Sequence, residues 1–250
     1  MKLLRAALDF LFAPRANCQG CGSELGSDRD WLCASCYAKL KPLYLTALVR
    51  EELCETCGGV IRGMGRCEAC GARGSSPFSA AAAYAYEPPV RQLIRGFKFR
   101  GVYRMEDWMA DEMLRACKAA GFPRCDFVQP VPMHWIRRNE RGIDHAARLA
   151  KAFTARADMP YRNVLRRARL TRQQAKQSGA ARRQALADAI RAKENLHGET
   201  VLLIDDVRTT GTTVSQCCKA LAEAGAGRVY VLTLARTERK ERAATDGDRG

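Results

Sequence analysis

Eight cysteines in the first 70 residues constrain the fold of this 250-residue chain more than any other feature. They form four pairs with two residues between the partners, namely Cys18/Cys21, Cys33/Cys36, Cys54/Cys57 and Cys67/Cys70. Two cysteines at this spacing can wrap a turn so that both thiolates face one ion, and two such turns complete a tetrahedral Zn²⁺ site. We therefore expect two structural Zn²⁺ ions, each bound by four cysteine sulfurs.

The pairing of these turns is open at this stage. Sequential pairing gives one site from the first four cysteines and a second from the last four, and a cross-braced arrangement is the alternative. A disulfide scaffold is disfavoured, because the N-terminal apolar run is interrupted by Asp9 and resembles a short amphipathic helix more than a secretory signal. Redox activity is disfavoured as well, since four such pairs in a row have no obvious redox use.

Composition and a linker-like segment divide the chain into domains. Apolar residues make up 47% of it, and no run of 18 apolar residues is present, so we expect no membrane insertion and a cytoplasmic location. Glycine, serine and proline at 74–77 indicate a linker. We expect an N-terminal amphipathic helix with a double zinc-ribbon module over residues 1–76, an α/β domain over 77–238, and a frayed polar tail over 239–250.

After the linker, strand and helix patterns alternate, which is typical of a parallel sheet with helices on its faces. The expected strands are 80–86, 127–131, 201–204 and 229–234. The expected helices are 88–97, 105–119, 145–157, 182–193 and 213–224. The fold class is therefore α/β, and a ligand is expected beyond the carboxyl ends of the strands.

The segment VLLIDDVRTTGTT at 201–213 has the composition of a phosphate-binding turn. A short apolar strand leads to two carboxylates, Asp205 and Asp206, and then to threonines and a glycine ahead of a helix. Backbone N–H groups at a helix N-terminus favour an anion. The alternative is an ordinary strand-turn-helix in which Asp206 or a threonine caps the helix, but seven polar or small residues exceed what capping requires.

The DDVRTTGTT element resembles the phosphoribosyl pyrophosphate (PRPP) motif of type I phosphoribosyltransferases. The four cysteine pairs, FKFRG at 97–101, PVP at 130–132, RRNERG at 137–142 and this element occur in the order seen in the ComF family of competence proteins. The resemblance covers about residues 17–236. It implies a type I phosphoribosyltransferase-like domain behind the zinc module.

The resemblance also implies residue roles. Asp205 and Asp206 would hold the ribose hydroxyls of PRPP, with Mg²⁺ bound to its pyrophosphate. The residues implied for the 5′-phosphate are Thr209, Thr210, Gly211, Thr212 and Thr213. The candidates for the pyrophosphate are Arg137, Arg138 and Arg141, since a guanidinium fork can bond two phosphate oxygens at once. The chain departs from the family at Ile143-Asp144-His145, where Phe-Asn-Gln is usual.

The positive charge is concentrated in one segment. The net charge is +15, and residues 134–183 carry 14 Lys and Arg against 3 Asp and Glu, a net of +11. Its part from 166 to 183 corresponds to the mobile loop that closes over PRPP in transferases. A second hypothesis is therefore a non-catalytic, nucleotide-sensing accessory protein that binds single-stranded DNA and other competence proteins. A solvated basic helix face is the simplest reading of the same charge.

Overall fold

The computed structural model describes residues 17–25, 31–45, 52–61, 65–71, 78–99, 105–133, 143–167 and 190–237. The strands are β1 (Phe78–Ala85), β2 (Phe127–Pro130), β3 (Leu165–Arg167), β4 (Ile190–Ala192), β5 (Thr200–Arg208) and β6 (Arg228–Arg236). The helices are α2 (Ala34–Ala38), a 3-10 turn η1 (Lys41–Leu43), α3 (Glu68–Gly71), α4 (Val90–Phe99), α5 (Glu106–Ala119), α7 (His145–Ala157) and α10 (Thr212–Glu223).

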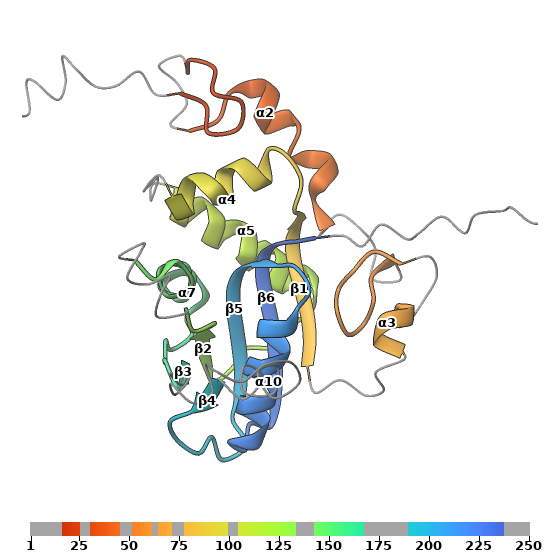
Figure 1. Cartoon of the computed structure of the whole chain (residues 1–250), viewed down its shortest axis with the longest axis vertical. Coiled ribbons are helices and arrows are strands. Elements are labelled where there is room, and N and C mark those ends of the chain that lie inside the picture. Colours follow the sequence, from red (N-terminus) through yellow and green to blue (C-terminus); the bar gives the residue numbers. More distant parts are fainter. Residues whose placement is uncertain are drawn as a thin grey trace, which may run out of the picture.

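Four strands form a parallel sheet in the order β1-β6-β5-β2 (Figure 1). β5 pairs with β6 along its whole length, from Thr200 opposite Arg228 to Arg208 opposite Arg236. On its other side β5 pairs with β2. The strand that carries the two adjacent carboxylates is thus an interior strand, and among the described strands its carboxyl end is held beyond Ile204 by β6 alone.

Both faces of this sheet are covered. Leu202 and Ile204 of β5 belong to a core that also contains side chains of α4, α5 and α7. The alternate residues Val201 and Leu203 belong to a second core with side chains of α10. Because successive strand residues point to opposite faces, an unbroken apolar run is what a strand buried on both sides requires. The expected α/β class is confirmed.

One expected helix is wrong in its described part. The segment 182–193 is expected to be a helix, yet residues 190–192 form β4, which pairs antiparallel with β3. Ile190 is buried and the next residue is exposed, which is the period of a strand. A long-range pairing partner overrides local helix propensity here. Residues 182–189 lie outside the described part of the chain.

The strand β5 is longer than expected. Pairing with β6 continues beyond Ile204 through both aspartates to Arg208. Thr212 and Thr213 already belong to α10. The connection itself is therefore only Thr209, Thr210 and Gly211, which leaves the two carboxylates on a hydrogen-bonded strand instead of in a loop.

The first cysteine module packs on the body through aromatic rings. Trp31 lies 4.6 Å from Trp108 of α5, and Tyr44 lies 4.5 Å from Tyr84 of β1, centroid to centroid. Cys18 and Cys36 are buried in the same apolar core as Tyr84. This module therefore completes the core on the α5 side of the sheet.

The second cysteine module lies beside the edge strand β1 (Figure 1). The amide of Ala80 donates to the carbonyl of Thr56 over 2.9 Å. Among the described residues, no helix has both the length and the apolar character needed to cross a membrane. The domain boundaries at 76 and 238 stay predictions, since 72–77 and 238–250 fall outside the described ranges.

Candidate functional site

The eight cysteines of the N-terminal modules gather into two clusters. One holds Cys18, Cys21, Cys33 and Cys36, and the other holds Cys54, Cys57, Cys67 and Cys70. Within each cluster all four sulfurs lie within 4.8 Å of one another. The pairing is therefore sequential, and the cross-braced alternative is not seen.

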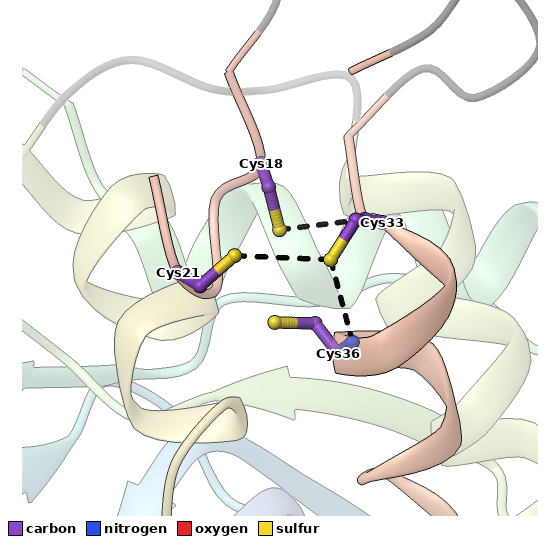
Figure 2. Close-up of side chains that lie close together, drawn as sticks. All are labelled: Cys18, Cys21, Cys33 and Cys36. Carbon is purple, nitrogen blue, oxygen red and sulfur yellow. Dashed lines mark hydrogen bonds between the residues drawn. The ribbon is translucent and has the colours of Figure 1, made fainter. Parts of the chain in front are cut away.

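The sulfur geometry suits zinc. Figure 2 shows the four side chains of the first cluster converging on one point. Cys21 and Cys33 are 3.7 Å apart at sulfur, and Cys57 and Cys67 of the second cluster are 3.8 Å apart. Four sulfurs at about 2.3 Å from one Zn²⁺ ion in a tetrahedron would stand about 3.8 Å from each other. Both clusters can hold structural zinc with no open coordination position.

Each cluster contains a thiol that ionises readily. Hydrogen bonds from the Ser23 side chain and backbone lower the pKa of Cys21 to about 6. Burial raises the pKa of Cys57, but the charge of Arg236, a backbone hydrogen bond from Gly59 and the charge of Arg208 outweigh it and bring the pKa to about 6. Backbone amides also point at sulfur, as the amide of Cys33 does toward Cys18 at 3.3 Å (Figure 2). Thiolate is the form that binds metal.

The turn after β5 leaves the start of α10 open. Gly211 is the N-cap residue with φ 76°, a left-handed conformation that suits glycine and that offers no side-chain cap, and the hydroxyl of Thr210 accepts from the amide of Thr212 over 3.5 Å. The first-turn amides of a helix have no acceptor within the helix. The hydroxyls of Thr210 and Thr212 stand 3.1 Å apart beside them. Asp206 pairs with Lys98 and does not cap this helix, whereas Thr210 makes one long capping contact, so the capping alternative holds only for a threonine. The remaining donors suit an anion.

The two aspartates differ in their surroundings. Asp205 accepts a hydrogen bond from the amide of Asp206 at its Oδ1, over 2.9 Å. Burial first, and then the charge of Asp206, raise the pKa of Asp205 to about 8, although Lys98 lowers it. Asp206 is buried and forms an ion pair with Lys98. One carboxylate is therefore neutralised by a cation, while the other holds a proton easily.

We expect the raised pKa of Asp205 to make stability fall with rising pH. A carboxyl whose pKa is higher in the folded state than in the unfolded chain stabilises fully below its unfolded pKa, near 4, and loses that contribution as pH rises through about 8. Between pH 5 and pH 9 the free energy of unfolding of wild type should therefore fall by on the order of 2 to 4 kcal/mol more than that of Asp205→Asn. Urea denaturation at both pH values measures this. Parallel pH profiles for the two proteins would contradict it.

Lys98 is a site residue that sequence reasoning left without a role. Its Nζ lies 2.7 Å from Oδ1 of Asp206, and the two side chains are 21% and 9% exposed. It stands near the C-terminal end of α4, within FKFRG, a motif that served only to support the resemblance. The signal that could have found it is its place between the aromatic residues Phe97 and Phe99.

Replacing Lys98 by Met should destabilise the protein by about 2 kcal/mol, because Asp206 would be left buried without its cation. Thermal or urea unfolding at pH 7 measures the loss. The matched control is Lys219→Met, whose ion pair with Glu223 is exposed at 61% and 65% and should be worth less than about 0.5 kcal/mol. Equal losses in the two variants would show that the Lys98 pair adds nothing.

The three candidate arginines Arg137, Arg138 and Arg141 lie outside the described residues, as do residues 168–183 of the expected lid. Asp144, at the family departure, is described. It is the N-cap of α7, and its Oδ1 accepts from the amide of Ala147 over 3.0 Å. A helix cap therefore accounts for this carboxylate.

Comparison with known proteins agrees with the α/β fold of the sheet domain. The Phosphoribosyl transferase domain family matches residues 139–248. The chain is 26% identical to "Competence protein F" of Haemophilus influenzae over 88% of this chain and 96% of that protein. It is 30% identical to "DNA utilization protein YhgH" of Salmonella typhi, over 61% of this chain and 69% of that one. It is 25% identical to "Competence protein ComFC" of Bacillus subtilis, over 88% and 95%.

Proposed function

The chain belongs to the ComF family of competence proteins, and from that premise we propose that the carboxyl end of β5 binds PRPP or a related ribose 5-phosphate. The observation that carries the proposal is the open N-terminus of α10 directly after Asp205 and Asp206. The short turn fits a phosphate, and the two acids precede it in the chain by a few residues. Phosphoribosyl transfer is the further step that this site would support.

In this proposal each group of residues binds a different part of the ligand. The amides and hydroxyls of Thr209 to Thr213 hold the 5′-phosphate. Lys98 occupies Oδ1 of Asp206, which leaves its other oxygen to accept from a ribose hydroxyl. Asp205 takes the second hydroxyl, and ligand binding should favour its ionised form. Arg137, Arg138 and Arg141 would contact the pyrophosphate.

Mg²⁺ would neutralise the pyrophosphate and so make it a better leaving group. Carboxylate oxygens are suitable ligands for that ion, and an oxygen of Asp205 that the ribose hydroxyl leaves free would be the one to face it. The protein's own contribution is then positioning: it fixes the sugar and the phosphate and excludes alternative poses at the anomeric carbon. Among the described residues of the site we assign no general base.

Calorimetric titration of the full chain with PRPP and Mg²⁺ tests the binding proposal. Ribose 5-phosphate is expected to bind more weakly and free ribose not at all, because the turn recognises the phosphate. Release of pyrophosphate in the presence of nucleobases tests transfer. Absence of PRPP binding at millimolar concentration would refute the proposed function, whereas binding with no pyrophosphate release would restrict it to a sensing role.

A second candidate is DNA handling in the cytoplasm. The printed names of the relatives refer to competence and DNA utilization, and the net charge of +11 over residues 134–183 favours a polyanion. Single-stranded DNA binding through phosphate contacts weakens steeply with salt. An oligonucleotide titration between 50 and roughly 200 mM salt, the range over which such contacts lose affinity, measures it. A flat salt dependence would exclude this candidate, and other competence proteins would then be sought as partners.

A further inference from the structure

Two buried arginines join the second cysteine cluster to the sheet. The carbonyl oxygen of Cys57 accepts from Nη2 of Arg208 and, over 3.1 Å, from Nη1 of Arg236. The same Nη1 of Arg236 lies 3.7 Å from the Cys57 sulfur. Arg208 is 7% exposed and Arg236 is 8% exposed. A metal-ligand residue is thus held by two charged side chains from the body.

Strand pairing forces these two cations together. Arg208 ends β5 and Arg236 ends β6, and the two residues are partners in the register of the parallel pair. The amide of Thr237 also donates to the carbonyl of Arg208 over 3.0 Å. Two like charges buried side by side are unfavourable unless negative charge lies close to them.

The second cluster can supply that negative charge. One divalent cation bound by four thiolates leaves a surplus of two negative charges, which two guanidinium groups match. The backbone has made room for the contact, because a Cβ on Gly59 would lie 2.2 Å from Nη1 of Arg236. Only glycine permits this close approach of the metal loop to the guanidinium.

The first cluster is attached in a different way. Its contacts with the body are the aromatic pair Trp31–Trp108 and the apolar core around Cys18 and Cys36. The two clusters therefore differ in what their metal does for the body, since one fills a core and the other faces charges at the ends of the site strands.

From these contacts we infer that Arg208 and Arg236 are the counter-ions of the metal in the second cluster. Through Arg208 that metal fixes the strand end from which the Thr209–Gly211 turn begins. Arg208 and Arg236 are positioning residues in this scheme. The affinity of the turn for its ligand then depends on the second metal and not on the first. The ligand part rests on the proposed function, whereas the metal part does not.

Zinc release tests the metal part. The zinc-loaded full chain is mixed with a chelator, and transfer of the two equivalents to a chromophoric indicator is followed over time. In Arg236→Gln and Arg208→Gln one equivalent should leave about 10-fold to 100-fold faster than in wild type, as is usual when a group that supports a metal ligand is lost. The other equivalent should leave at the wild-type rate, which also shows that the variant is folded.

Three further variants complete the test. Arg236→Lys keeps the charge and should restore slow release in part, and Arg124→Gln, an exposed arginine that bonds Asp158, should change neither equivalent. Zinc release rates that are equal in wild type, Arg208→Gln and Arg236→Gln would overturn the inference.

For the ligand part, PRPP affinity with Mg²⁺ should fall at least 10-fold in Arg236→Gln but not in Cys21→Ser, which lacks the first metal. Equal PRPP affinities of wild type and Arg236→Gln would overturn the coupling between the second metal and the ligand. A wild type that binds no PRPP would refute the proposed function and leave the zinc-release result intact.

Discussion

Replacing Cys36 by Ser is expected to remove one of two zinc equivalents and to lower the free energy of unfolding by at least about 3 kcal/mol. Structural zinc in finger peptides binds with about 10 to 16 kcal/mol, and that energy is folding energy. Cys36 is 3% exposed and shares a core with Leu32 and Leu40, so loss of the ion would also open this core. For a chain of this size the midpoint of thermal unfolding should fall by about 10 °C.

The control for this prediction is Cys117→Ser. Cys117 is 4% exposed in the same core but lies outside both clusters. A buried hydroxyl in place of this thiol should cost about 1 to 3 kcal/mol and leave both zinc equivalents bound. Metal content by mass spectrometry and thermal unfolding are the two measurements. Two zinc equivalents retained in Cys36→Ser would rule out the metal site described for the first cluster.

Asp206→Asn is expected to weaken PRPP binding at least 100-fold. The substitution removes a charged acceptor for a ribose hydroxyl and also breaks the pair with Lys98, which leaves an ammonium group 21% exposed and without its carboxylate. A hydrogen bond to a charged group contributes about 1.5 to 3 kcal/mol, and the upper part of this range corresponds to the expected change. Calorimetry with PRPP and Mg²⁺ measures it.

Two comparisons make this result specific. Inorganic phosphate contacts only the turn in this proposal, so its affinity should change less than 3-fold, roughly the limit of an indirect effect. Asp126→Asn alters a carboxylate at the opposite end of β5, where Oδ2 accepts from the amide of Thr200. It should leave PRPP affinity unchanged. If Asp126→Asn weakens PRPP as much as Asp206→Asn does, the effect is on folding and the site assignment fails.

Local patterns sufficed for most elements of the sheet domain. The helix expected at 145–157 is α7 with the same bounds, and the strands expected at 80–86 and 127–131 begin or end within two residues of β1 and β2. The errors occur where pairing with a distant strand determines whether a segment is a strand and where that strand ends. β4 has only three residues and exists because β3 pairs with it, and β5 runs on to Arg208 because β6 continues beside it.

The site was accessible from sequence only where its residues are neighbours in the chain. Asp205, Asp206 and the turn form one segment, and the cysteine pairs have a spacing that indicates their chemistry. Lys98, by contrast, meets Asp206 across more than a hundred residues, and Arg208 meets Cys57 across 151. Such contacts follow from strand order and helix placement, which no local pattern contains. The assignment of Arg137, Arg138 and Arg141 stays a prediction.

The aromatic contact between Trp31 and Trp108 also has a consequence for how much of this protein a cell accumulates. The first cysteine module leaves the ribosome before α5 does, so zinc capture can precede the synthesis of the surface that it covers. In a zinc-starved cell, newly made chains would present Trp108 and the ring of Tyr84 without their partners from the module. Chaperones and proteases act on such exposed surfaces. Metal supply would then set the abundance of the protein before it could affect any binding step.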